Sequence, residues 1–220
     1  MSKKRYPPRI PRTAYGFRAQ NLKNPPRGAW WAKRWIQAIE SLRLGARSGR
    51  GKTYAECGQV IDLQATGPHV EARVLGSRPD PYTVKMDFAP APVEALRKNT
   101  SWTDAFGAMT CGRILAGEMP LTVDEFFASH GISPYPSQET DRFWCSCPDW
   151  SKPCKHIAAV LYLLGDALIR DPSLLLRFRG ISLDRGNGEG PRTEALPLWK
   201  GTIRLSDAVE RIRRRAGMSS

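Results

Sequence analysis

The sequence lacks any long hydrophobic run. Its longest apolar stretch, residues 157–164, has eight residues, whereas a membrane-spanning helix needs about 20. The first twelve residues, MSKKRYPPRIPR, are basic, but no apolar segment follows them, so they do not resemble a secretory signal peptide. These absences argue against a membrane protein, and we expect no membrane partner.

Signatures of an enzyme are also missing. The sequence contains no paired carboxylates with a pocket pattern and no nucleophile–base motif. The stretch ARSGRGKT at residues 46–53 resembles a phosphate-binding loop, but Ala46 stands where that motif needs glycine. A predicted helix also precedes it, in place of the required strand, so we interpret it as a turn that leads into a strand. The sequence predicts no enzyme and no small-molecule substrate.

Acidic residues are nearly absent from the first 52 residues, which contain Glu40 alone against fourteen Lys or Arg. The rest of the chain is balanced, so this quarter carries the whole net charge of +13. Such an asymmetry indicates an anionic partner, most often nucleic acid, although a solvated tail that only aids solubility is the alternative. The predicted contacts are the basic residues before position 30: Lys3, Lys4, Arg5, Arg9, Arg12, Arg18, Lys23 and Arg27.

The patterning predicts an α+β fold, with a small antiparallel β-unit plus helices. Helical spacing of Trp31, Trp35 and Ile39 predicts an amphipathic helix over residues 29–44, with the tryptophans in the core. Cys57 is expected to be buried. The strands are expected at 54–57, 60–63, 70–74 and 82–88, and three further helices at 90–99, 102–115 and 122–129, the last with a Thr122–Glu125 capping box.

Five segments follow from this pattern. They are a basic disordered arm (1–29), an amphipathic helix and β-meander (30–90), a helical segment (91–140), a zinc module with its following helix (141–180), and a Gly-rich linker with a basic C-terminal helix (181–220).

Cysteines are few and clustered. The chain has five, an odd number that favours metal binding in a reducing compartment over disulfides. We expect the cytoplasm, or the nucleus if the source is a eukaryote. Four potential metal ligands, Cys145, Cys147, Cys154 and His156, fall within twelve residues. Residues two apart on a strand point to the same side, so the first two can grip one ion. Pro153 suits the first turn of a helix, which would carry the other two.

The cluster therefore predicts a Cys3His zinc-stabilised strand–loop–helix module. Soft thiolates and imidazole favour Zn²⁺ over calcium or magnesium, and an iron–sulfur cluster is the alternative. Four protein ligands fill a tetrahedral site and leave no position for water, so the site is expected to be structural. The apolar helix behind the ligands would tie the ion to the core and end near Arg170, before the turn at Asp171 and Pro172.

The stretch CSCPDWSKPCKHIAAVLYLLGDAL resembles the SWIM-type zinc finger, whose pattern is CxC-xn-CxH, and all four ligand positions match. GSRPDPYTVKMDF at 76–88 and DPSLLLRFRG at 171–180 are similar to bacterial stand-alone SWIM proteins. The resemblance implies zinc binding and a role in DNA or protein binding, with Swi/Snf-type helicase-like ATPases as partners. It implies no catalytic activity.

Two functions remain open on the sequence. The first is a zinc-dependent nucleic-acid-binding protein, with DNA as the expected partner, that assists a Swi/Snf-type helicase-like ATPase. The second is a protein–protein interaction adaptor, in which the zinc module or the apolar stripe of residues 205–217 docks a larger partner.

Overall fold

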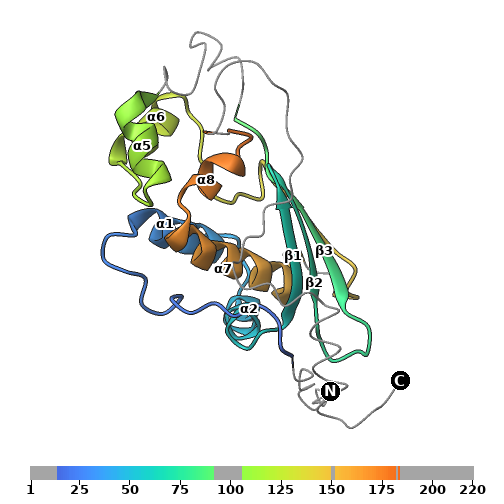
Figure 1. The fold of residues 1–220 in the computed structure, drawn as a ribbon. Helices are drawn as coiled ribbons and strands as arrows, with labels where there is room; N and C mark the ends of the chain where they lie inside the picture. Colours follow the sequence, from blue (N-terminus) through green and yellow to red (C-terminus); the bar gives the residue numbers. More distant parts are fainter. Residues whose placement is uncertain (1–13, 92–105, 150–151, 182, 184–220) are drawn as a thin grey trace.

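The computed structural model describes residues 14–91, 106–149, 152–181 and 183. They form a four-stranded antiparallel sheet with helices packed against one face (Figure 1). The predicted α+β class is confirmed, with four strands and six helices in the described ranges. Within those ranges no helix has the length and apolar character to span a membrane.

The sheet has the order β1 (Val60–Thr66), β2 (His69–Val74), β3 (Tyr82–Asp87) and β4 (Arg142–Cys145). The first three are predicted strands, and they are confirmed. The fourth strand comes from much later in the chain. The prediction of a strand at 54–57 is wrong. Buried and exposed side chains alternate strictly along β2, so one face is covered and the other faces solvent.

Helix α7 (Lys155–Arg170) is the centre of the core, and every residue from 156 to 168 is buried. A helix that is apolar all round must be enclosed on all sides. The sheet, α1 (Trp30–Ser41), α2 (Ala46–Glu56) and α8 (Ser173–Arg177) all contact it. The predicted end near Arg170 is confirmed, with Asp171 as the C-cap residue.

Helix α1 holds its tryptophans in the core, as predicted. The Trp31 and Trp35 indole nitrogens each donate to a backbone carbonyl of α7, at 2.8 and 2.9 Å. Trp35 can lie this close because Gly165 of α7 faces its ring, where a Cβ would meet the indole at 2.8 Å. The helix ends at Ser41, earlier than predicted, and Arg43 follows with a φ of +53°.

Helix α2 replaces the predicted turn and strand over 46–57, so that expectation is wrong. Gly51 explains why the helix forms, because α2 crosses α7 at this residue: a Cβ there would lie 2.4 Å from the Ala158 Cβ. Ser48 shares a hydrogen bond of 2.6 Å with the Tyr162 hydroxyl nearby. Packing against α7 therefore stabilises a sequence of poor helix propensity. Cys57, expected to be buried, is exposed at the helix end.

We expect Gly51→Ala to destabilise the fold by about 1–3 kcal/mol, since the helices must separate to admit the methyl group. Gly49→Ala is the matched control in the same helix, because its Cβ would have no atom within 4 Å. Alanine has the higher helix propensity, so this change should stabilise by up to about 1 kcal/mol. Urea unfolding measures both; equal effects of the two substitutions would contradict the close crossing.

Residues 14–29 were expected to be part of a disordered arm, and for these residues the expectation is wrong. Ala14, Ala19 and Leu22 are buried. The backbone amides of Gln20 and Asn21 donate to one carboxylate oxygen of the fully buried Asp166, at 3.0 and 2.7 Å. A buried carboxylate on α7 thus fastens this segment to the core. Residues 1–13 lie outside the described residues.

Two helices form a hairpin at the end of the molecule away from α2 (Figure 1). These are α5 (Ala108–Leu115) and α6 (Leu121–Ser129). α5 begins later than predicted, after Gly107 with a φ of +78°. The predicted capping box of α6 is wrong, because Pro120 holds the N-cap position and no side chain caps the helix. The helix expected at 90–99 lies outside the described residues from position 92 onwards, as does the C-terminal helix.

Candidate metal centre

Four buried side chains meet where β4 ends and α7 begins. Cys145 is the last residue of β4, and Cys147 follows two residues later. Cys154 is the N-cap residue of α7, and His156 lies in its first turn. The predicted strand–loop–helix arrangement is confirmed, except that Pro153 stands just before the helix and not inside it.

The geometry of this cluster suits a tetrahedral metal site. The three sulfur atoms and a ring nitrogen of His156 all lie within 4.8 Å of one another. The His156 Nδ1 atom lies 3.8 Å from both the Cys145 and the Cys154 Sγ atoms. Zn–S bonds of about 2.3 Å and Zn–N bonds of about 2.0 Å place tetrahedral ligand atoms roughly 3.6 Å apart. The donor set and its spacing therefore fit Zn²⁺.

The thiols perturb one another strongly. A hydrogen bond from the Cys145 thiol lowers the pKa of Cys154 to about 3, and the same bond raises the pKa of Cys145. Burial raises the pKa of Cys147. Without a cation, the buried sulfurs must share protons to limit their charge. A bound dication would replace those protons, which is how thiolate sites couple metal binding to proton release.

Packing, more than hydrogen bonding, fixes the His156 ring. Its centroid lies 4.5 Å from that of Tyr82 and 5.6 Å from that of Tyr54. The Nε2 atom is buried and has no hydrogen-bond partner in the described part of the chain. Gly76 lies beside this atom, with its Cβ position 3.4 Å away. The imidazole is therefore held by aromatic walls with Nδ1 turned toward the sulfurs.

The loop around the cluster is fixed by backbone contacts. The Cys147 amide lies 3.5 Å from the Cys145 Sγ atom, as a donor to sulfur. Lys152 donates to the Cys145 carbonyl at 2.9 Å. Such outer contacts orient the ligands of a metal site and tune their basicity. One lysine thus holds the end of β4 against the loop.

The predicted nucleic-acid contacts are only partly within the described residues. Lys3, Lys4, Arg5, Arg9 and Arg12 lie outside them. Arg18, Lys23 and Arg27 are exposed on the segment 14–29. Lys23 forms an ion pair of 3.8 Å with Glu56 of α2. These three side chains therefore lie along a segment that is packed on the core, and Lys23 of this segment lies beside α2.

Sequence reasoning missed the basic residues that α2 brings to the zinc module. Arg47 lies 3.5 Å from the Asp149 carboxylate in the metal loop. The Lys155 ammonium lies 4.9 Å from the centre of the Tyr54 ring. The signal was present in the spacing of Arg47 and Arg50, which places two cations on neighbouring positions of a helix. Gly49 and Gly51 concealed it, because they favour a turn.

The fold and the cluster define a zinc-finger protein of the Cys3His class. Residues 144–165 match the family described as SWIM zinc finger. The chain therefore carries a SWIM zinc finger, which confirms the resemblance inferred from the ligand spacing.

The chain is also similar to the uncharacterized protein Rv2102 of Mycobacterium tuberculosis. The two are 38% identical over 176 residues, which cover 79% of this chain and 63% of that protein. The chain thus spans less than two thirds of the length of this curated relative. No solved structure matches the chain.

Proposed function

We propose that this protein is a zinc-binding, non-catalytic protein that binds nucleic acid, with DNA as the expected partner. The main support for this proposal is the charge asymmetry, because the first 52 residues contain fourteen Lys or Arg and one acidic residue. Many cations in one region neutralise phosphates and release counterions, which drives binding without sequence recognition. The described part of this region, from residue 14 onwards, is held against the zinc module by α2 and by Asp166.

In this proposal Cys145, Cys147, Cys154 and His156 hold the ion. The zinc supplies a structural cross-link between the end of β4 and the start of α7. Four protein ligands leave no open position for water or substrate, which supports a non-catalytic role. Because α7 is the centre of the core, the ion stabilises the whole fold and not only its own loop.

We also infer a partner and a compartment for this protein. The likeness to bacterial SWIM proteins supports an accessory role beside a Swi/Snf-type helicase-like ATPase. None of the five cysteines, all of which lie within the described residues, forms a disulfide, which supports a reducing compartment, for which we propose the cytoplasm.

Binding of the zinc-loaded chain to a 20-base-pair duplex should weaken steeply with salt. Each neutralised phosphate contributes about 0.9 to the slope of log K against log salt, so four contacts give a slope of about −3.6. Fluorescence anisotropy at several salt concentrations measures this slope. Replacing Lys3, Lys4, Arg5, Arg9 and Arg12 by Gln should reduce the slope, because these five cations are among the expected phosphate contacts. Absence of binding at low salt, or binding that salt does not change, would contradict the proposal.

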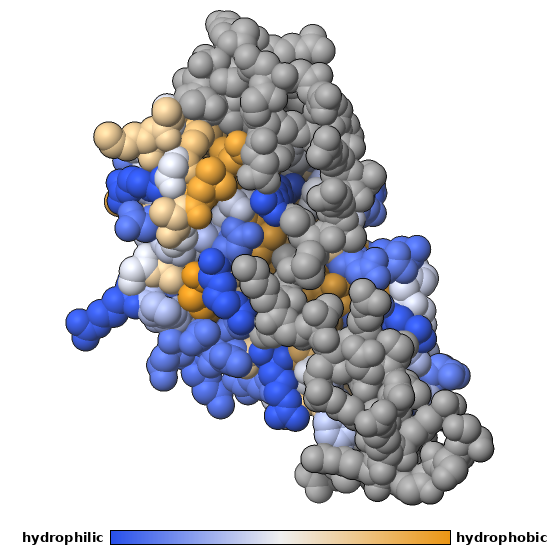
Figure 2. Space-filling view, in the orientation of Figure 1, coloured by the Kyte–Doolittle hydropathy of each residue, from blue (hydrophilic) through white to orange (hydrophobic). Residues whose placement is uncertain are grey.

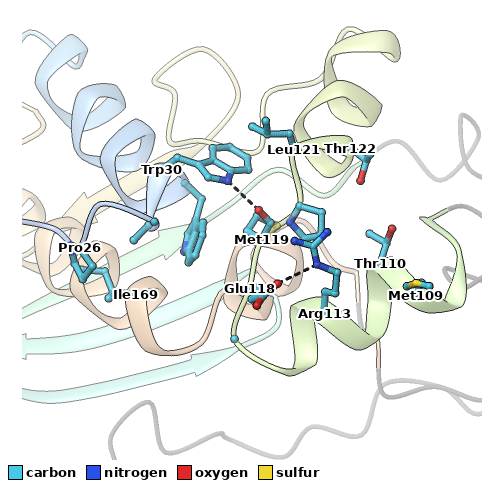
Figure 3. A pocket seen from close by; sticks show the side chains of 15 residues that line it. Pro26, Trp30, Met109, Thr110, Arg113, Glu118, Met119, Leu121, Thr122 and Ile169 are labelled. Carbon is cyan, nitrogen blue, oxygen red and sulfur yellow. Dashed lines mark hydrogen bonds and ion pairs between the residues drawn. The ribbon is translucent and has the colours of Figure 1, made fainter.

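A second candidate function is a protein-interaction adaptor, and one feature favours it. A cavity of about 960 Å³ lies between the start of α1 and the α5–α6 hairpin (Figure 3). Trp30, Met109 and Leu121 line it, and Met109 and Leu121 are more than half exposed. Figure 2 shows a hydrophobic area over this hairpin, at the upper left. Exposed apolar surface of this kind is typical of interaction sites.

Capture from native lysate separates the two functions. A stoichiometric ATPase that co-purifies after nuclease treatment, with no affinity of the pure chain for DNA, favours the adaptor. Direct binding of DNA by the pure chain favours the first function.

A further inference from the structure

We propose that helix α2 forms the centre of a surface that contacts the phosphate backbone of duplex nucleic acid. We define the α2 surface by seven basic residues from three parts of the chain: Arg18, Lys23, Arg47, Arg50, Lys52, Lys152 and Lys155. This inference rests on the proposed nucleic-acid binding and names the site where it occurs.

The zinc module and α2 form one flank of this surface. Gly51 lies against the first turns of α7, with its Cβ position 3.1 Å from the Lys155 carbonyl oxygen. The Lys155 ammonium lies over the Tyr54 ring, and Arg47 reaches the metal loop at Asp149. The cations of the finger therefore stand beside those of α2, although they are about 100 residues apart in sequence.

The segment 14–29 forms the other flank. The Ala19 amide donates to the Ala55 carbonyl at the end of α2, at 3.0 Å. The Arg18 side chain lies 3.2 Å from the Cβ position of Gly58, just beyond α2. Lys23 pairs with Glu56 on the last turn. Figure 2 shows hydrophilic side chains at the lower left, on the side where Figure 1 draws this segment and α2.

The charge of the surface is strongly one-sided. Within the stretches that form it, the described acids are Glu56 and Asp149, and each lies in an ion pair with a cation of the surface. Seven cations against two anions leave an excess of five positive charges on these stretches. A field of this sign attracts a polyanion and steers its approach.

The outer side of α2 allows a backbone to come close. Its exposed positions include Gly49 and Thr53, which precede and follow the exposed Arg50 in the sequence. The aromatic residue of the helix, Tyr54, is buried. Single-stranded nucleic acid is held by exposed rings that stack on bases, and α2 offers none. Short side chains and fixed cations suit the regular phosphates of a duplex instead.

The test compares two double substitutions with equal change in charge. Arg50→Gln with Lys52→Gln removes two cations from the α2 surface. Arg73→Gln with Lys85→Gln removes two from β2 and β3, where both side chains are exposed on the open face of the sheet. Each chain is titrated, zinc-loaded, with a 20-base-pair duplex and with a single strand of the same length, at several salt concentrations.

The α2 variant should lose about 1.8 from the salt slope on duplex, and roughly thirty-fold in affinity at 0.15 M salt, since two phosphate contacts are lost. The sheet variant should retain the slope of the original chain. Equal effects of the two variants, or a loss of affinity seen only on the single strand, would contradict the α2 surface as the duplex-binding site. The proposed nucleic-acid binding would still hold in that case. If the unsubstituted chain binds neither probe at low salt, the proposed function fails as well.

Discussion

Replacing Cys154 by serine is expected to release the zinc and to unfold the core of the protein. Cys154 is fully buried at the N-cap of α7, where its Sγ atom lies 3.8 Å from the His156 Nδ1 atom. A serine hydroxyl is a poor zinc ligand compared with a thiolate. Structural zinc contributes on the order of 10 kcal/mol, comparable with the entire stability of a small domain.

The extent of this unfolding shows whether the zinc stabilises the whole core or only the loop that binds it. Helix α7 contacts the sheet, α1, α2 and α8, so loss of its anchored end should remove the cooperative transition of the whole core. Metal analysis should find one zinc per chain before the substitution and far less after it, and circular dichroism should show loss of the thermal transition. A strong chelator should reproduce both results.

Two other cysteines serve as controls. Cys57→Ser changes an exposed thiol outside the cluster, and Cys111→Ser changes a buried thiol on α5. Neither should change the zinc content. If Cys154→Ser retained one zinc per chain and an unchanged transition, the ligand assignment would be wrong.

The metal site could be predicted because its determinants are local. Four ligands within twelve residues specify the cluster, and the alternation of residues 60–88 specifies the meander. The fold of α2 could not be predicted in the same way. Its glycines disfavour a helix, and what stabilises the helix is Ala158, about 100 residues later in the chain.

The ordered conformation of residues 14–29 also could not be predicted from the local sequence. This segment is rich in polar residues and proline, which is typical of disorder. Asp166 accepts hydrogen bonds from the backbone amides of Gln20 and Asn21, which lie far from it in the sequence. No local sequence pattern predicts a contact over that separation. The basic surface around α2 was missed for this reason, since its three parts meet only in the folded chain.

A buried ion pair gives the second large expected effect. Arg179 and Asp141 are both buried and lie 2.6 Å apart, and the arginine also donates to the carbonyls of Ala89 and Tyr135. Asp141 accepts this guanidinium and two backbone amides, so it joins the segments around residues 89, 137 and 179.

Asp141→Ala should therefore destabilise the protein by about 3–5 kcal/mol, because it leaves a guanidinium buried without its counter-charge. Glu118→Ala is the matched control, since it breaks the exposed pair with Arg113 and should change stability by less than about 1 kcal/mol. Urea unfolding measures both differences, and zinc content should stay at one per chain wherever the variant is folded. An Asp141→Ala variant as stable as the control would mean that packing, and not this pair, holds the end of α8 to the sheet. Loss of zinc from a folded variant would mean that Asp141 also orients the metal loop.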